Sequence, residues 1–242
     1  MTAVPDGPER GDAFGAALLD QNAGIRATVV IERDDGFIDG ETTDYLSGFD
    51  ERDLWAMNRA VGRVLDVGAG AGRAALLLQE RGHQVTALDN SPGAARVCRD
   101  RGVRDVFCGT AEEAAVSPLA ASFDSVLLLG NNLGLLGSAA AAGPYLTTLG
   151  ALLKPGGVIV GTCIDVYQTA KQVHRDYQER NRRRGRMAGQ LTMRVRYQRL
   201  TTDWFDWLAL SADELAALAT PAGWRVADML PGTGYAVVLQ RS

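Results

Sequence analysis

Short apolar runs alternate with amphipathic segments from residue 63 onward. Five runs have the length of a strand: 63–67, 84–88, 105–108, 125–129 and 158–163. Each run is apolar on both faces and is followed by residues with helical spacing, which is typical of a parallel sheet covered on both sides. Ser91 before Pro92 is a helix N-cap signal between two of the runs. The pattern therefore predicts a doubly wound α/β fold.

The C-terminal end departs from this repeat. The tetrapeptide SADE at 211–214 predicts a capping box that starts a helix, and apolar strands follow at 224–230 and 235–240. Because only the short turn PGTG joins these two strands, they form a hairpin, and the last strand is antiparallel to its neighbour. Together with the earlier runs, the hairpin predicts a seven-stranded, mostly parallel sheet with an antiparallel last strand.

An insertion at 166–210 follows the fifth strand. Its sequence predicts a helix over 166–180, a basic turn NRRRGR, and an alternating strand over 191–200. Residues 166–200 carry ten Lys and Arg against two acidic residues, a local net charge of +8, whereas the whole chain has −4. This concentration of positive charge suits an anion, although an exposed basic turn is more often a solvated surface.

The first predicted strand runs directly into a glycine-rich turn, RVLDVGAGAGRA. Glycine lets the backbone approach a ligand closely, and the helix N-terminus after such a turn faces the polar end of that ligand. Both dinucleotide-binding proteins and S-adenosylmethionine-binding proteins use this arrangement. The turn alone therefore predicts a nucleotide-like ligand without choosing between the two classes.

Further segments accompany the glycine turn. They are Asp89 in VTALDNSPGA, FDSVLLLGN at 123–131, LLKPGGVIV at 152–160, and the terminal hairpin. With these pieces in this order, the chain from about residue 61 to its end resembles the class I S-adenosylmethionine-dependent methyltransferases. The resemblance implies a methyltransferase domain over 61–242, with the insertion facing the substrate, and an N-terminal helical cap or lid over 1–60. It also implies S-adenosylmethionine as cofactor and S-adenosylhomocysteine as product.

The resemblance places cofactor contacts at the carboxyl ends of the first two strands. Asp66 serves the ammonium of the methionine moiety, directly or through water, and the amides of the glycine turn face the methionine and the ribose. Asp89, 23 residues after Asp66, accepts both ribose hydroxyls, as an acidic residue does in dinucleotide sites. The implied cofactor-binding residues at this end are Asp66, Gly68, Ala69, Gly70, Asp89 and Asn90.

The loop after the third strand is the implied adenine site. The family commonly has an aspartate here for the adenine amino group, and this chain has Thr110 at that position. The amide of Ala111 meets a ring nitrogen of the adenine. Glu112 or Glu113 could replace Thr110 as the acceptor, although both residues also suit a solvated helix start.

The turn after the fourth strand reads GNNLGLLGS and lies beside the transferring methyl group in the family. Gly130 and Asn131 are implied cofactor contacts and Asn132 a substrate contact, although asparagine also closes such turns without touching a ligand. Methyltransferases that act on amines of large substrates often have N-P-P and an aromatic residue here. This chain has neither the proline nor the aromatic residue, which favours a small-molecule acceptor over a nucleic-acid base.

Alternation along LTMRVRYQRL predicts a strand with two different faces. Met193, Val195 and Tyr197 share the apolar face, and Arg194 and Arg196 share the other. The guanidinium fork suits a carboxylate or a phosphate, so the arginine pair is a candidate contact for an anionic acceptor. The alternative is a solvated pair that only keeps the strand soluble.

Aromatic residues supply the other candidate substrate contacts. Tyr167, His174 and Tyr177 fall on one helical stripe, which either packs in the core or covers the acceptor. Tyr45 in the N-terminal region and Trp204 in the insertion are further candidates. His174 is the candidate general base, and an acceptor that is already ionised needs none.

Composition limits the class of protein. The chain of 242 residues has three widely spaced cysteines, no C-x-x-C pair, no basic and apolar leader, and no apolar run of the roughly 18 residues that a membrane span needs. We therefore expect a cytoplasmic protein, a monomer or homodimer, that binds no metal and no membrane. The net charge of −4 argues against a nucleic-acid partner.

The favoured function is methyl transfer from S-adenosylmethionine to an O, N or C atom of a small molecule, such as an anionic metabolite or a natural-product intermediate. Two alternatives stay open from the sequence. One is a nicotinamide-dependent oxidoreductase, which the terminal hairpin disfavours. The other is a protein that binds S-adenosylmethionine and no longer methylates.

Overall fold

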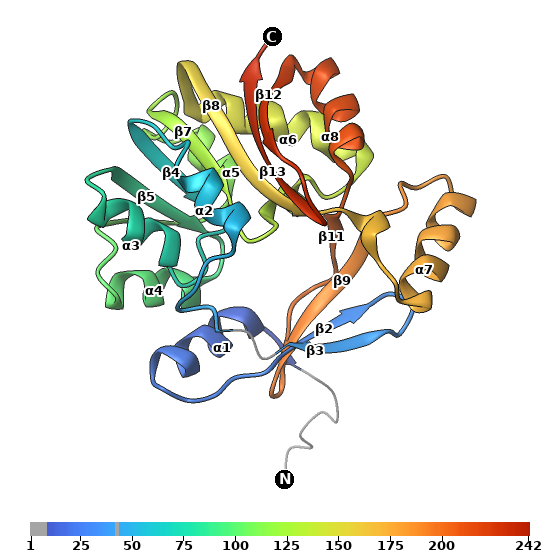
Figure 1. Ribbon diagram of the computed structural model, residues 1–242. Helices are drawn as coiled ribbons and strands as arrows, with labels where there is room; N and C mark the ends of the chain where they lie inside the picture. The colour runs from blue at the N-terminus through green and yellow to red at the C-terminus, as the bar shows by residue number, and fades with distance from the viewer. Residues whose placement is uncertain (1–8, 42–43) are drawn as a thin grey trace.

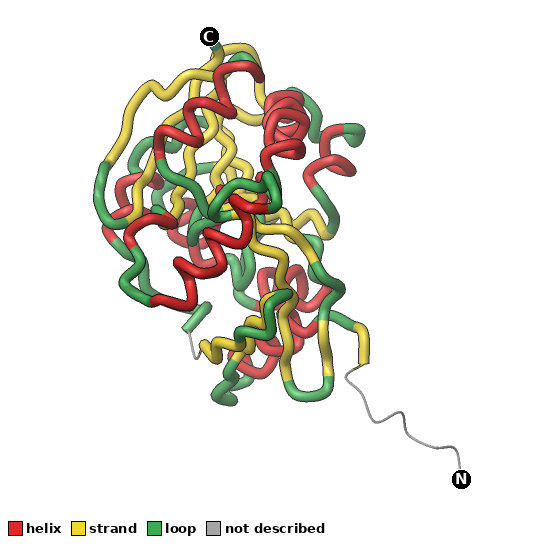
Figure 2. The backbone as a smooth tube through the Cα atoms, turned by 90° about the vertical axis from the view of Figure 1, so that its right-hand side faces the viewer, coloured by secondary structure: helices red, strands yellow, loops and turns green. Residues whose placement is uncertain are grey.

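The strands of the protein form two separate sheets, as the computed structural model in Figure 1 shows. The structure describes residues 9–41 and 44–242. Figure 2, turned by 90°, shows the strands of the larger sheet in the upper part of the molecule and those of the smaller sheet in the lower part.

The larger sheet has seven strands: β4 (Arg63–Val67), β5 (Gln84–Asp89), β6 (Asp105–Cys108), β7 (Phe123–Leu128), β8 (Leu153–Ile164), β12 (Trp224–Leu230) and β13 (Gly234–Arg241). Their order across the sheet is β12-β13-β8-β7-β4-β5-β6. Strands β4 to β8 are parallel to one another, and β13 lies antiparallel between β8 and β12. The doubly wound α/β fold and the antiparallel last strand are thus confirmed. Strand β8 starts at residue 153, five residues before the predicted start, so it includes the KPGG segment.

Helices cover both faces of the seven-stranded sheet, and each buries one apolar stripe. They are α3 (Arg73–Glu80), α4 (Pro92–Asp100), α5 (Ala111–Ala115), α6 (Ala139–Leu152) and α8 (Ala212–Ala219). One apolar core contains side chains of α3 and α4, and a second core contains side chains of α5, α6 and α8. Two predicted caps are confirmed: Ser91 caps α4, and Ser211 forms a capping box with Glu214 at the start of α8.

The second sheet joins segments that are far apart in the sequence. Its strands are β1 (Glu9–Arg10), β2 (Val29–Arg33), β3 (Ile38–Glu41), β9 (Gln190–Tyr197), β10 (Leu200–Thr201) and β11 (Phe205–Leu208). Strand β9 is central: it pairs with β2 on one side and with β10 and β11 on the other. The N-terminal region and the insertion after the fifth strand therefore form one unit.

The N-terminal region contains the expected helices and also strands that the pattern did not predict. The helices are α1 (Ala13–Asn22) and α2 (Glu51–Met57), and the hairpin of β2 and β3 lies between them. Its turn contains Asp35 and Gly36, and Gly36 has a φ of 83°. An Asp-Gly pair between two apolar segments is a known hairpin signal, because glycine accepts a positive φ without strain.

The insertion helix is shorter than predicted. Helix α7 spans Gln172–Arg183, and a separate turn of 3-10 helix, η2 (Val166–Gln168), comes before it. The side chain of Asp165 caps this turn by accepting a hydrogen bond from the amide of Tyr167. Tyr167 therefore does not lie on the helix that carries His174 and Tyr177, and the predicted stripe of the three residues is not formed.

Helix α1 docks the second sheet onto the first. The Asp12 carboxylate accepts hydrogen bonds from the amides of Gly15 in α1 and Gly93 in α4, both at 2.8 Å, and from the Ser91 hydroxyl at 2.8 Å. A Cβ on Gly93 would lie 2.6 Å from the backbone of Gly15, so the two helices touch without side chains between them. This contact places α1 beside the carboxyl end of β5.

A second joint lies at the other end of the smaller sheet. The 3-10 helix η1 (Asn132–Leu136) follows β7, and a Cβ on its Gly134 would lie 2.0 Å from the ring of Trp207. Trp207 belongs to β11, so its ring rests directly on the backbone of η1. The second sheet is thereby held at both ends against the carboxyl edge of the seven-stranded sheet.

Over residues 9–41 and 44–242, none of the helices combines the length and the apolar character that a membrane span requires. The same residues contain no group of three or more His, Cys, Asp and Glu that could hold a metal ion. Cys98 and Cys163 are buried, and Cys108 is exposed.

Candidate functional site

The glycine turn lies between β4 and α3 and has the positive-φ backbone that its glycines allow. Gly68, Gly70 and Gly72 have φ values of 70°, 55° and 73°, a region that side chains disfavour. A Cβ on Gly72 would also lie 2.8 Å from Val103. The amides of Gly68 and Ala69 both donate to the carbonyl of Leu88, at 2.8 and 3.0 Å, so the end of β5 holds the turn in place.

Asp89 ends β5 and links the glycine turn to α4. Its Oδ2 accepts a hydrogen bond from the Gly70 amide at 2.8 Å, and its Oδ1 accepts one from the Ser91 amide at 2.9 Å. Burial raises the pKa of this carboxyl above its ordinary value, against these two hydrogen bonds. A carboxylate has about four acceptor positions, so each oxygen keeps one for a ribose hydroxyl. The amides of Gly68, Ala69 and Gly70 were expected to face the cofactor. They donate instead to the last two residues of β5, Leu88 and Asp89.

Asp66, at the end of β4, is a buried carboxylate with an unused oxygen. Its side chain is 2% exposed, and Oδ2 has no hydrogen-bond partner. Burial raises the pKa of Asp66 to about 7, against the attraction of Arg73, and the neighbouring charges of Asp89 and Asp53 add to the rise. A buried carboxylate that lacks a donor is unfavourable by itself, and the ammonium group of a bound ligand would supply that donor.

Asp53, in α2, forms a buried network behind the glycine turn. It is 3% exposed, and its Oδ1 accepts hydrogen bonds from the Gly130 amide at 3.0 Å and the Thr162 hydroxyl at 3.1 Å. Its Oδ2 accepts one from Arg73 at 3.1 Å. Arg73 also donates to the carbonyl of Gly48. Asp53 therefore ties the N-terminal region to the ends of β7 and β8.

The turn after β7 is held in a fixed conformation by its neighbours. Gly130 and Asn131 both have positive φ values, 63° and 71°. The Asn131 side-chain oxygen accepts a hydrogen bond from Arg52 at 3.1 Å, and the backbone amide of Asn131 donates to the Thr162 hydroxyl at 3.0 Å. Asn132 donates to the carbonyl of Gly68 at 2.9 Å, which brings this turn against the glycine turn. The two loops predicted to hold the cofactor are thus in contact.

At the predicted adenine site, the side chain of Thr110 caps helix α5. Its hydroxyl accepts a hydrogen bond from the Glu113 amide at 3.2 Å, and the Glu113 side chain accepts one from the Thr110 amide at 2.8 Å. This capping box starts α5 and leaves Ala111 buried. The hydroxyl of Thr110 keeps its proton for a further contact, but its oxygen already serves the helix. Asn90, after Asp89, is exposed.

Residues of the N-terminal region lie against the glycine turn. The rings of Phe14 and Tyr45 meet edge to face at 5.1 Å between centroids. Both side chains pack against the apolar cluster that contains Ala71, and a Cβ on Gly70 would lie 3.9 Å from Phe14. Tyr45, a predicted substrate contact, is therefore placed beside the cofactor loops.

The other predicted substrate residues lie in two places away from these loops. Arg194 and Arg196 both donate to Glu32 in β2, at 3.0 and 3.2 Å, and the Arg194 guanidinium stacks 4.7 Å above the ring of Trp204. Trp204 is 44% exposed. The arginine pair is therefore neutralised in part and held on the protein.

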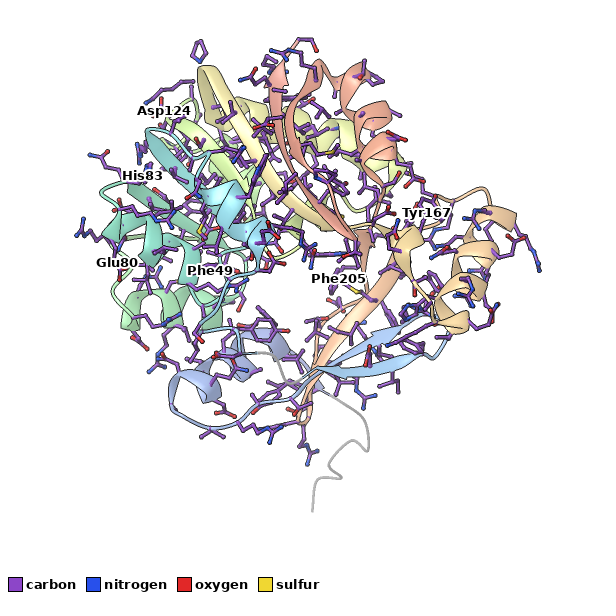
Figure 3. All side chains as sticks on the ribbon, in the orientation of Figure 1. Phe49, Glu80, His83, Asp124, Tyr167 and Phe205 are labelled. Atoms are coloured by element: carbon purple, nitrogen blue, oxygen red, sulfur yellow. The ribbon has the colours of Figure 1, made fainter. Side chains whose placement is uncertain are left out.

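Tyr167, His174 and Tyr177 make contacts within the insertion. Tyr167 is labelled in Figure 3, and its hydroxyl donates to Glu214 at 2.6 Å. Tyr177 is buried, and its hydroxyl donates to Asp34 at 2.7 Å. His174 meets the ring of Phe37 at 5.4 Å, and burial followed by the charges of Arg33 and Lys171 lowers its pKa. The structure does not bring these three residues together with the cofactor loops.

Sequence reasoning missed several residues of the site. Asp53 was not singled out, although it falls on the same helical stripe as Ala56 and Met57, which are buried. A charged residue on a buried stripe is a usable signal, since such a residue needs partners. Arg73 follows the glycine turn directly and is the only positively charged residue between Arg63 and Arg81. Phe14 gave no comparable signal.

Comparisons with known proteins agree with this geometry. A family model described as a methyltransferase domain matches residues 64–157, from β4 into β8. A solved S-adenosylmethionine-dependent methyltransferase from Bacteroides fragilis, in complex with S-adenosyl-L-homocysteine, has a TM-score of 0.81 and 27% identity; the match covers 96% of this chain and 95% of that chain. The similarity therefore extends over both sheets. No curated protein sequence matches the chain.

Two further structures share the fold at lower identity. The CcbJ methyltransferase from Streptomyces caelestis has a TM-score of 0.65 and 13% identity over 95% of this chain and 98% of that chain. A methyltransferase from Methanosarcina mazei has a TM-score of 0.60 and 16% identity over 78% of this chain and 96% of that chain.

Proposed function

We propose that the chain is a class I S-adenosylmethionine-dependent methyltransferase and that it methylates a small molecule held between the cofactor loops and the second sheet. The observation that carries the proposal is the pair of carboxylates at the ends of adjacent strands β4 and β5. Asp66 is buried with an unused oxygen, and Asp89 keeps free acceptor positions. These groups fit the ammonium and the ribose diol of S-adenosylmethionine.

The roles of the individual residues follow from their positions. Asp66 would hold the ammonium of the methionine moiety, and Asp89 the ribose hydroxyls. Gly130 and Asn131 would border the methyl-transfer position, because the turn after β7 touches the glycine turn through Asn132. Thr110 and Ala111 would border the adenine. The cofactor supplies an activated methyl group, so the protein has to align the acceptor and exclude water, which provides much of the acceleration.

Three observations support a small acceptor and no general base from His174. The turn Gly130 to Leu133 has no proline or aromatic residue for an extruded base, and the chain has a net charge of −4. His174 packs on Phe37 at the hairpin of the second sheet. We therefore propose that the reaction uses an acceptor that is nucleophilic without deprotonation by His174.

Calorimetric titration with S-adenosylhomocysteine tests the cofactor site. Asp89→Asn keeps the size of the side chain and removes its charge, and it should weaken binding at least tenfold, since a charge-assisted contact is worth about 1.5–3 kcal/mol. Asp100→Asn, in an exposed ion pair at the end of α4, is the matched control and should bind like the parent. Equal affinity of Asp89→Asn and the parent would contradict the assignment, as would tight binding of NADH in place of S-adenosylhomocysteine.

A transfer assay tests the reaction class separately. The protein with labelled S-adenosylmethionine should label metabolites in a small-molecule extract and leave tRNA, rRNA and DNA unlabelled. His174→Ala should transfer at the parent rate. Labelled nucleic acid would contradict the small-molecule proposal, and binding without any labelled product would favour a protein that binds the cofactor and no longer methylates.

A further inference from the structure

Strand β9 presents two chemically different faces, and the pairing of its neighbours extends both. Residues opposite each other in antiparallel strands point to the same side of a sheet. Met193 lies opposite Arg33 of β2 and Phe205 of β11, and Leu191 lies opposite Trp207. Val195 lies opposite Ile31. One face of the sheet therefore combines the side chains of Ile31, Arg33, Leu191, Met193, Val195, Tyr197, Phe205 and Trp207.

This apolar face is the one turned toward the cofactor loops. Val195 and Tyr197 are buried in a cluster to which Phe14, Tyr45 and Phe205 contribute. Phe14 and Tyr45 also pack against the cluster around Ala71 in the glycine turn. The two rings thus contact both the apolar face and the cofactor loops.

The other end of the same face reaches the turn beside the methyl-transfer position. The ring of Trp207 rests on Gly134, in the 3-10 helix that begins at Asn132. Between this contact and the Tyr45 ring, Ile31, Met193 and Phe205 are only partly buried. Figure 3 shows Phe205 across the space between the two sheets from Phe49, whose ring lies 5.0 Å from the guanidinium of Arg73.

The arginines of β2 and β9 are not available to an acceptor on that face. Arg194 and Arg196 alternate with Met193 and Val195 and therefore point to the opposite side, where both bind Glu32. Arg33 does lie on the apolar face, but it is 6% exposed. Its guanidinium stacks between the rings of Tyr177 and Phe37 and pairs with Asp35 at 2.7 Å.

We infer that the acceptor binds against the apolar wall formed by Ile31, Met193, Phe205 and Trp207, and that it is an uncharged molecule with a ring system. The inference rests on the proposed methyl transfer and adds the class of acceptor. A thioether and two aromatic rings bind flat apolar molecules well. An anionic group at this wall would lose its hydration without gaining an unpaired arginine of β2 or β9, which is unfavourable.

Two fluorescent probes of matched ring structure test the class of acceptor. N-phenyl-1-naphthylamine is neutral, and 8-anilinonaphthalene-1-sulfonate has the same rings with a sulfonate. Each is titrated into the protein saturated with S-adenosylhomocysteine. The neutral probe should bind at least tenfold more tightly than the sulfonate. Tighter binding of the sulfonate, or no binding of either probe, would overturn the inference.

Neighbouring residues on opposite faces of β9 provide the matched variants. Met193→Glu should weaken the neutral probe at least tenfold while the affinity for S-adenosylhomocysteine stays within twofold, and Arg194→Gln should change neither affinity by more than twofold. Loss of probe binding in Arg194→Gln alone would favour the arginine face instead. Phe205→Asn repeats the test if the thermal midpoint of Met193→Glu shows that it does not fold.

Calorimetry on the same samples separates the two levels of the proposal. If the parent protein binds S-adenosylhomocysteine but the probes do not distinguish Met193→Glu from Arg194→Gln, only the apolar acceptor wall is refuted. If the parent does not bind S-adenosylhomocysteine at all, the proposed methyl transfer itself fails.

Discussion

The two sheets of this protein differ in how their charged side chains are buried and paired. At the seven-stranded sheet, the carboxylates of Asp66 and Asp89 are buried at the ends of strands, and that of Asp53 is buried in α2 beside them; backbone amides or Arg73 bind Asp53 and Asp89. In the second sheet, the charges of Glu32, Arg194 and Arg196 pair with one another on a partly exposed face.

The difference matches the two tasks of a methyltransferase site. A buried carboxylate with unused acceptor positions is costly unless a ligand completes it, so such groups mark the place of the polar cofactor. A partly exposed ion pair is already complete and keeps charge off the opposite, apolar face. Under our proposals, the first sheet binds the charged cofactor and the second binds an uncharged acceptor.

The largest expected effect comes from removing the charge at the centre of the first sheet's network. Asp53→Ala leaves Arg73, the Gly130 amide and the Thr162 hydroxyl without their shared acceptor. Breaking a buried pair of this kind costs about 3–5 kcal/mol. Urea unfolding should show a loss of that size in the free energy of unfolding.

Asp53→Asn is the companion variant for this experiment. It keeps an oxygen for Gly130 and Thr162 and removes the charge that faces Arg73, so its loss should be smaller than that of Asp53→Ala. Equal stability of Asp53→Ala and the parent protein would show that the Asp53 network does not stabilise the fold.

The same contrast explains how much the sequence could predict. Residues 63 to 132 form the glycine turn, Asp66, Asp89 and the turn after β7 in one continuous stretch, so local patterns were enough to place them. The second sheet depends on pairing β2 with β9, for example Ile31 with Val195, across more than 150 residues. No local pattern reports such a pairing.

The faces of β9 show the limit most directly. Alternation in LTMRVRYQRL correctly separated an arginine face from an apolar face. It did not show which face meets the cofactor loops, because that depends on where Glu32, Phe14 and Tyr45 lie. Glu32 lies more than 160 positions from Arg194 in the sequence, and its carboxylate forms ion pairs with both Arg194 and Arg196.

A smaller effect, in ligand affinity, should come from the pH dependence of Asp66. Its raised pKa of about 7 means that the unliganded protein holds this carboxyl partly protonated near neutral pH. Binding of the S-adenosylhomocysteine ammonium requires the ionised form, so affinity should rise with pH. The increase between pH 6 and pH 8 should be about tenfold, or about 1.4 kcal/mol.

Calorimetry at several pH values measures this dependence. Asp66→Asn has no proton to lose, so its affinity should be low and constant over the same range. A parent protein with equal affinity at pH 6 and pH 8 would show that Asp66 does not meet the ammonium, and would leave the role of its unused oxygen to another group of the cofactor.

The smallest effect should come from the charged face of the second sheet. Glu32 binds Arg194 and Arg196 with side chains that are 16%, 24% and 37% exposed, so water and salt screen the three charges. Pairs of this kind contribute about 0.2–1 kcal/mol each. Glu32→Gln should therefore lower the free energy of unfolding by about 1 kcal/mol or less, and 1 M sodium chloride should remove most of the difference from the parent.

Glu32→Gln also frees the arginine pair without touching the apolar face, which makes it a direct test of the contrast between the sheets. If the face of Arg194 and Arg196 lies outside the acceptor site, transfer to the true acceptor should keep its kcat/KM within twofold while stability falls slightly. A gain in kcat/KM for acceptors that carry a carboxylate would mean that Glu32 had been blocking an anion site, and that the second sheet binds a charged acceptor.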